Sequence, residues 1–340
     1  WQEINYLTAV KDYKGILLTF LMAVVAGLAA GYLLVRAGAD PVLSLFGCVI
    51  IAYGIMLVWY YRLLIQYFPQ GRGTSLAFME WIDRYPQLMG VGTCIGIGLY
   101  IHLILMWASP IGVQIKGLFY SAPGYDVPAL FAFLSILITT INFVTSVEVN
   151  FYPKYQIYFG LFNHGGTLID IENARDDMIE TLLKELSYAF AKQFFATVVF
   201  IVGGTLLIPR LPFGFTEEML GIYRVLCVGY AFYATGNCIM LMSLYFADNV
   251  GALLSSVAYA VCSVLGTWFT MNGDSRYYGF GFLIAGIIFT ATALMRLISY
   301  LKKLDYHVIS KQPLIQSKKT GPAARLSRKL EERYCEKEKI

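Results

Sequence analysis

The stretch GFGFLIAGIIFTATALMRLI at positions 279–298 contains a single charged residue, Arg296, close to its end. A helix needs about 20 mostly apolar residues to cross the hydrocarbon core of a membrane. A strand of a membrane barrel would instead alternate apolar and polar residues over about ten positions. The stretch therefore predicts a membrane-spanning helix.

Further stretches of the same kind occur earlier in the chain. They lie near positions 15–35, 42–61, 87–108, 128–147, 191–208, 220–246 and 251–271. Because lipid offers no hydrogen bonds, an apolar run of this length has to be helical. We predict an all-α polytopic membrane protein with about eight transmembrane helices. They form one transmembrane domain over 1–314, and a basic cytoplasmic tail follows over 315–340.

The composition supports the same class of protein. Of the 340 residues, 58% are hydrophobic and 14% are charged. A soluble domain has about 25% charged residues, so this chain has too few charges to cover a water-exposed surface. The composition excludes a soluble enzyme, a disordered protein and a collagen-like fibre.

The positive charges predict the orientation of the chain. If the segment before the first span is cytoplasmic, 21 of the 26 lysines and arginines fall on the cytoplasmic side and 4 on the other, with Arg224 inside a span. Lysine and arginine are enriched in cytoplasmic loops. We therefore expect both ends of the chain in the cytoplasm and, from the family resemblance given below, the bacterial inner membrane as the location.

One long segment outside the predicted spans is amphipathic. Thr167 followed by Asp170 is typical of a helix start, and apolar residues then recur at helical spacing up to about position 190. Acidic residues including Asp176, Asp177 and Glu180 lie on the opposite face. Such a face disfavours attachment to anionic lipid, so we predict a cytoplasmic helix that docks a partner or packs under the bundle.

Three predicted spans carry polar residues on one face. Ser135, Thr139, Asn142 and Ser146 share a face of the fourth span, Tyr230, Tyr233 and Asn237 share a face of the sixth, and Tyr259 belongs to such a face in the seventh. These faces must look toward other helices or a wet cavity. They either join helices through polar contacts or line a hydrophilic path for a sugar polymer, and the spacing leaves both interpretations open.

The sequence shows no convincing catalytic set. His102, His164 and His307 have no metal-ligand spacing, and the six cysteines are scattered. We expect no enzymatic activity, no metal and no cofactor.

Three stretches together resemble the PelG family of exopolysaccharide transporters. They are APGYDVPALFAFLSILITTINFVTSVEVNFYPKYQIYF at 122–159, ARDDMIETLLKEL at 174–186, and GFGFLIAGIIFTATALMRLISYLKKLDYHVISKQPL at 279–314. The resemblance extends over the chain up to about Leu314. It implies a transporter that resembles the multidrug/oligosaccharidyl-lipid/polysaccharide flippase superfamily, with about twelve helices in two bundles around a cavity.

The resemblance also implies a function and partners. The substrate would be a Pel-type polymer of N-acetylated hexosamines, exported during synthesis of the biofilm matrix. A cytoplasmic glycosyltransferase would make it, and other Pel membrane subunits, one of which senses cyclic di-GMP, would complete the assembly. Eight spans and a first residue, Trp1, that is not Met lead us to expect a chain truncated at its N-terminus. The alternatives are a flippase for lipid-linked oligosaccharides and a non-transporting scaffold for the glycosyltransferase.

Overall fold

The computed structural model describes residues 2–68, 76, 78–210, 214–310 and 321–337. Eight helices in this part of the chain are long and apolar enough to cross a membrane. The predicted all-α polytopic membrane fold is therefore confirmed. The predicted tail at 315–340 lies partly outside the described residues, and its described part forms helix α14 (Pro322–Lys337).

The chain divides into two compact units, residues 1–76 with 327–340 and residues 77–326. The first unit contains α1 (Gln2–Ala9), α2 (Tyr13–Arg36) and α3 (Pro41–Tyr67). Helices α2 and α3 approach closely where Gly27 meets Cys48 and Ala52, since a Cβ on Gly27 would lie 2.8 Å from the Cys48 carbonyl oxygen. The hydroxyl of Tyr60 donates to the Ile16 carbonyl at 3.1 Å and ties the same pair of helices together.

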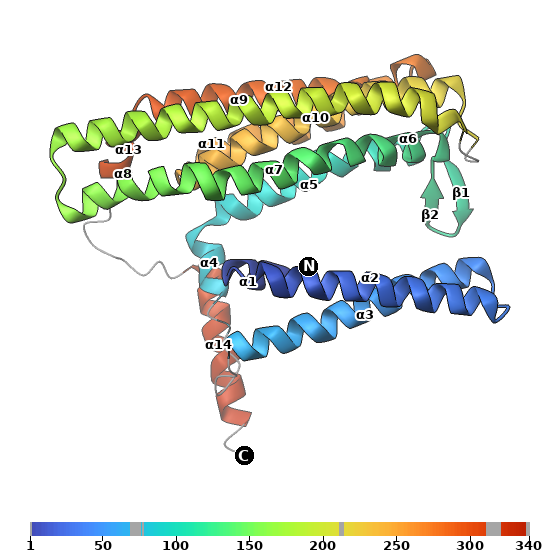
Figure 1. Cartoon of the computed structure of the whole chain (residues 1–340), viewed down its shortest axis with the longest axis horizontal. Coiled ribbons are helices and arrows are strands. Elements are labelled where there is room, and N and C mark those ends of the chain that lie inside the picture. Colours follow the sequence, from blue (N-terminus) through green and yellow to red (C-terminus); the bar gives the residue numbers. More distant parts are fainter. Residues whose placement is uncertain (1, 69–75, 77, 211–213, 311–320, 338–340) are drawn as a thin grey trace. The chain divides into compact units, whose positions relative to one another are not determined.

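The second unit contains the remaining spans. Its elements are α4 (Met79–Arg84), α5 (Pro86–Trp107), β1 (Val113–Lys116), β2 (Phe119–Ser121), α6 (Pro123–Phe133), α7 (Leu137–Ser146), α8 (Tyr152–His164), α9 (Leu168–Leu207), α10 (Glu217–Tyr245), α11 (Asn249–Met271), α12 (Phe280–Leu301) and α13 (Leu304–Ser310). Within this unit the hairpin of β1 and β2 marks one end of the long helices (Figure 1). The connection from α8 to α9 and helix α13 mark the opposite end, which we call the α8–α9 end.

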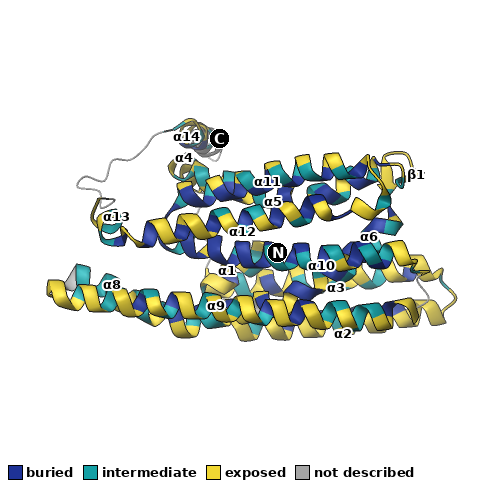
Figure 2. Ribbon diagram, turned by 90° about the horizontal axis from the view of Figure 1, so that it is seen from above, coloured by how far each residue is buried: buried dark blue, intermediate teal, exposed yellow. Residues whose placement is uncertain are grey.

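Helices α5, α10, α11 and α12 form the centre of the second unit, and buried residues follow them in Figure 2. Helices α11 and α12 cross at Gly266 and Gly281, where a Cβ on Gly281 would lie 2.2 Å from the Gly266 carbonyl carbon. Two glycines let these backbones touch, as small residues do in membrane bundles. By contrast, much of α9 is exposed, as expected for a helix whose apolar side chains face lipid.

Helix α9 joins two predicted elements, the amphipathic helix and the fifth span, into one 40-residue helix. At 1.5 Å per residue it is about 60 Å long, twice the hydrocarbon thickness of about 30 Å. It begins with the predicted pair, because the Thr167 side chain accepts from the Asp170 amide and the Asp170 carboxylate accepts from the Thr167 amide. About half of α9 therefore projects beyond the membrane at the α8–α9 end.

Candidate functional site

The segment from α6 to the π-helix, residues 123–151, is an interrupted helix, and part of it packs against α9. Pro128 lies inside α6, a 3₁₀ turn covers Leu134–Ile136, and a π-helix covers Val147–Phe151. Proline lacks the amide proton of a regular helix, and π-helical turns recur at functional sites. Helix α7 is thus a ten-residue segment with an irregular turn at each end.

A polar groove of about 340 Å³ lies between α7 and α9 at the level of the π-helix. Asparagine, serine, threonine, tyrosine, lysine and glutamate side chains provide most of its lining: Asn142, Thr145, Ser146, Asn150, Lys184, Glu185, Tyr188 and Lys192. The groove therefore brings Asn142 and Ser146 of the predicted path together with residues of α9. Hydroxyls, amides and an aromatic ring are the groups that hydrogen-bond and stack with sugars.

Glu185 holds the two sides of this groove together. Its carboxylate accepts hydrogen bonds from the Ser146 hydroxyl and, at 2.9 Å, from the Asn150 side-chain amide. The Lys192 ammonium lies 4.5 Å from the centre of the Tyr188 ring. The groove consequently presents one fixed carboxylate and two lysines.

A much smaller pocket of about 10 Å³ adjoins this groove. It shares Asn142, Ser146 and Glu185 with the groove and adds Thr139. Thr139 also lines an apolar cavity of about 410 Å³ between α9, α10 and α12, where Leu186 and Phe190 are among its neighbours. We call the contact between the Leu134–Ser146 segment and α9 the α7–α9 seam.

Buried polar atoms without partners occur on both sides of the α7–α9 seam, in the Leu134–Ser146 segment and on α9. Among the described residues, the Ser135 hydroxyl, the Thr139 hydroxyl and the Gln193 carbonyl oxygen Oε1 have no hydrogen-bond partner. The exposed fractions of these residues are 0%, 2% and 1%. An unmade hydrogen bond at a buried group costs about 1–3 kcal/mol, so such atoms are uncommon without a role.

A model of the family described as "PelG: Putative exopolysaccharide Exporter (EPS-E)" matches residues 1–309. The chain belongs to the PelG family. No curated protein and no solved structure matches it. The family and the eight apolar helices together make the chain a multi-pass membrane protein with a role in exopolysaccharide export.

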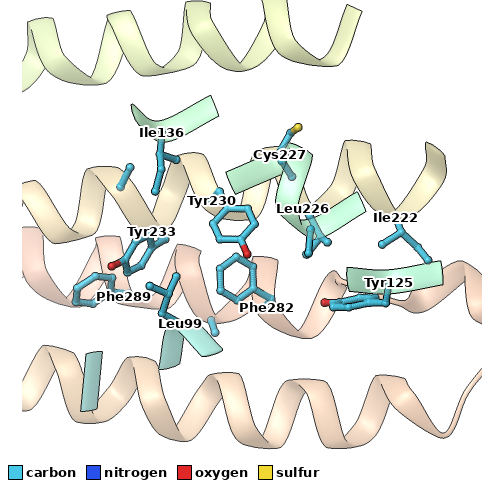
Figure 3. Close-up of a cluster of buried hydrophobic side chains, with 14 of the residues drawn as sticks. Leu99, Tyr125, Ile136, Ile222, Leu226, Cys227, Tyr230, Tyr233, Phe282 and Phe289 are labelled. Carbon is cyan, nitrogen blue, oxygen red and sulfur yellow. The ribbon is translucent and has the colours of Figure 1, made fainter. Parts of the chain in front are cut away.

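In this PelG-family chain the three predicted tyrosines lie apart from the groove. Tyr230, Tyr233 and Tyr259 are buried among the helices at the centre of the second unit. Figure 3 shows Tyr230 and Tyr233 beside Phe282 and Phe289. The rings of Tyr233 and Tyr259 stack with their centres 5.6 Å apart. We call this cluster, with His102, Tyr125, Phe282 and Phe289, the tyrosine core. Asn237 is half-buried on α10 and lines none of the cavities described above. A single path through all the predicted residues stays a prediction.

The His102 ring lies at the centre of the tyrosine core. Its Nδ1 atom is 2.9 Å from the Tyr125 hydroxyl and its Nε2 atom is 3.4 Å from the Tyr230 hydroxyl. A neutral imidazole has one donor and one acceptor, so the two hydroxyls satisfy both ring nitrogens. The arrangement is that of a structural histidine inside an apolar core.

The predicted acidic face of α9 is exposed in the PelG-family chain. Asp177 pairs with Lys154 of α8 at 2.5 Å, Asp176 pairs with Arg175, and Glu180 is also exposed. Arg175 additionally contacts Asp305 of α13 at 2.5 Å, and the Tyr158 hydroxyl donates to the same carboxylate at 2.7 Å. Asp305, part of the sequence LDYH that carries the family resemblance, thus fixes the helices of the α8–α9 end.

Sequence reasoning missed the residues that α9 supplies to the groove. Glu185, Tyr188 and Lys192 lie on a helix whose pattern is dominated by apolar residues and by its acidic face. A signal was present at Gln193, since an amide inside the run AFAKQFFATVVF needs a partner in lipid. That its Oε1 atom is buried without a partner could not be found without the structure.

Proposed function

We propose that this chain is an inner-membrane transporter subunit that exports Pel-type exopolysaccharide, a polymer of N-acetylated hexosamines, from the cytoplasm to the exterior. The polar groove between α7 and α9 is the observation that carries the proposal, because its hydroxyls, amides and tyrosine suit a sugar chain. The family match supports export of an exopolysaccharide.

The proposal includes the orientation of the chain in the membrane. Both ends of the chain are cytoplasmic, because lysine and arginine then concentrate on the cytoplasmic side. The α8–α9 end faces the cytoplasm in this orientation. The polar groove then opens where a polymer leaving a cytoplasmic enzyme would reach the membrane.

The chain acts in this proposal as a carrier and not as an enzyme. A cytoplasmic glycosyltransferase makes the polymer, and further Pel membrane subunits, including a cyclic di-GMP sensor, join the assembly. The projecting half of α9, with Asp176, Asp177 and Glu180 exposed, offers this enzyme a charged surface. Reversing the three charges to lysine should release the glycosyltransferase from purified membranes if this surface holds it.

The transport role can be tested in cells that secrete the polymer. Asn142→Trp places a large ring in the groove and should reduce secreted polymer at least tenfold. Leu137→Trp, at an exposed apolar position of the same helix, should leave secretion unchanged. Both variants should reach the membrane in equal amounts. Normal secretion by the Asn142 variant would contradict the proposal.

A second candidate function is a flippase for lipid-linked oligosaccharides. The apolar cavity of about 410 Å³ beside the polar groove favours it, since the two could hold a lipid tail and a sugar head. Transport of lipid-linked oligosaccharide by the purified protein in liposomes, with no transport of free polymer, would favour this candidate.

A further inference from the structure

The segment that runs from α7 through the π-helix borders a second groove. This groove has a volume of about 540 Å³ and lies between that segment, the start of α8 and the end of α10. We call it the π-helix groove, and the described residues that line it are Phe143, Val144, Val147, Glu148, Tyr155, Leu241, Met242, Leu244 and Tyr245. The residues that the same segment supplies to the polar groove are different ones: Asn142, Thr145, Ser146, Val149 and Asn150. The segment therefore borders two separate grooves.

The two grooves differ in chemical character. Of the nine described residues that line the π-helix groove six are apolar, whereas eight of the nine that line the polar groove carry a polar or charged group. Sugar hydroxyls need hydrogen-bond partners when they leave water, and an apolar lining does not provide them. The π-helix groove therefore suits a ligand with a large apolar part rather than a sugar chain.

The polar residues of the π-helix groove lie toward the α8–α9 end. Glu148 follows Val144 by four residues along the first wall, a step of about 6 Å. Tyr245 follows Leu241 by the same step along α10, and both walls run toward the α8–α9 end in this direction (Figure 1). Val144 and Leu241 are exposed, as expected for side chains that face lipid. The groove is thus apolar at the level of the membrane and polar toward one surface, which is the order of the parts of a phospholipid.

Two aromatic rings and one carboxylate make up the polar end of the π-helix groove. The rings of Tyr155 and Tyr245 have centres 5.8 Å apart and planes at 85° to each other. Glu148 lines the same groove, and a carboxylate has about four acceptor positions, so it can bind a ligand as well as a partner within the protein. Aromatic rings attract cations, and carboxylates form strong hydrogen bonds with ammonium groups. The polar end therefore suits an ammonium group.

The charges near the π-helix groove distinguish between kinds of phospholipid. Glu148 is the one charged residue among the described residues that line the groove. Lys154 is the nearest lysine or arginine to Glu148 in the chain, and it pairs with Asp177 of α9. A headgroup with a net negative charge would lie next to Glu148 without a cation to balance it, which is unfavourable. A headgroup with a primary ammonium supplies that cation and up to three hydrogen-bond donors.

We propose that the π-helix groove binds a phospholipid with an ethanolamine headgroup. The ammonium lies between Glu148, Tyr155 and Tyr245, and one acyl chain follows Val144 and Leu241 into the membrane. The bound lipid connects the π-helical segment to α10 and holds this side of α7, while another side of α7 borders the polar groove. The site goes beyond the proposed function and does not require the polymer.

The test compares two phospholipids that differ only in the headgroup. The full chain, purified in detergent, is titrated with phosphatidylethanolamine and with phosphatidylglycerol of the same acyl chains, and native mass spectrometry measures the affinity for the first bound lipid. The wild-type protein should bind phosphatidylethanolamine about tenfold more tightly. Glu148→Gln and Tyr245→Leu should each reduce this preference to about twofold or less, and neither should weaken the binding of phosphatidylglycerol.

The matched control is Glu172→Gln, which removes an exposed carboxylate of α9 outside the π-helix groove and should leave the preference intact. Equal binding of both lipids by the wild-type protein, or a preference that survives in Glu148→Gln and Tyr245→Leu, would overturn the site. Glucosamine oligomers in excess should not displace phosphatidylethanolamine, since displacement would assign the ammonium site to an amino sugar and overturn the lipid assignment. Each of these failures leaves the transport proposal standing, because secretion by Asn142→Trp tests that proposal separately.

Discussion

The α7–α9 seam and the tyrosine core both contain buried polar residues, and they differ in how far these residues find partners inside the protein. In the tyrosine core His102 has hydroxyl neighbours at both ring nitrogens. Next to the core, where Gly98 packs against the Tyr259 ring, Ser263 of α11 donates to the Gly98 carbonyl at 2.8 Å, and we include Ser263 with the core. The Tyr259 hydroxyl is a fully buried atom of this cluster without a partner. In the seam Ser135, Thr139 and Gln193 all have an open position.

This difference separates polar residues that stabilise the fold from those that are available to a ligand. A buried polar group that is satisfied inside the protein contributes to stability, while an unsatisfied one lowers stability. We therefore expect substitutions in the core to change stability and substitutions in the seam to change transport.

The largest effect on stability is expected at the crossing of α11 and α12. Gly281→Val should destabilise the protein by about 3 kcal/mol or more, because the added carbons overlap the backbone of Gly266. Gly92→Val is the control, since its Cβ would meet no atom within 4 Å. Thermal unfolding in detergent measures both, and equal midpoints would show that the helices do not cross at these glycines.

The next largest effect is expected at the ion pair between α11 and α12. Arg296 contacts Asp248 through two hydrogen bonds of 2.7 and 2.9 Å, and the Asp248 side chain is only 3% exposed. Arg296→Gln should cost about 2 kcal/mol, less than the 3–5 kcal/mol of a fully buried pair because Arg296 is partly exposed. Arg276→Gln, which removes an exposed contact of 3.8 Å, should change stability by less than about 0.5 kcal/mol. The same unfolding measurement compares them, and equal losses would contradict the difference in burial.

The smallest change in stability is expected in the seam. Thr139→Val removes a hydroxyl that has no partner, so the free energy of unfolding should stay within about 1 kcal/mol of wild type or rise, while secretion falls. Ser263→Ala in the core should lower stability by about 1 kcal/mol and leave secretion per molecule unchanged. If both variants lose stability and neither loses secretion, the two regions do not differ in role.

The sequence predicts the spans because hydrophobic length alone determines them. The stretch at 279–298 becomes part of α12, and the start of α9 at Thr167 follows from local capping chemistry. The residues that face each other across the bundle were not predictable. The sequence pattern of a polar helix face does not show whether its side chains find hydrogen-bond partners on the neighbouring helices. The Tyr230 hydroxyl has such a partner in His102, whereas the Thr139 hydroxyl has none.

The irregular turns beside α7 were also beyond sequence reasoning. Pro128 gives a local reason for irregularity in α6, but nothing in VEVNF indicates a π-helix. The β1–β2 hairpin was missed as well. Its first strand, VQIK at Val113–Lys116, alternates apolar and polar residues, but strands of four and three residues between two spans are too short for the pattern to distinguish them from a loop.

A reversible link across the α7–α9 seam tests the central claim most directly. In a background without other cysteines, Ser146→Cys and Glu185→Cys are joined by a short, reducible bis-methanethiosulfonate reagent in secreting cells, with each single variant as control. If the polymer passes along the seam, linking should stop secretion in the double variant alone, and reduction should restore it. Undiminished secretion from a fully linked protein would contradict the account.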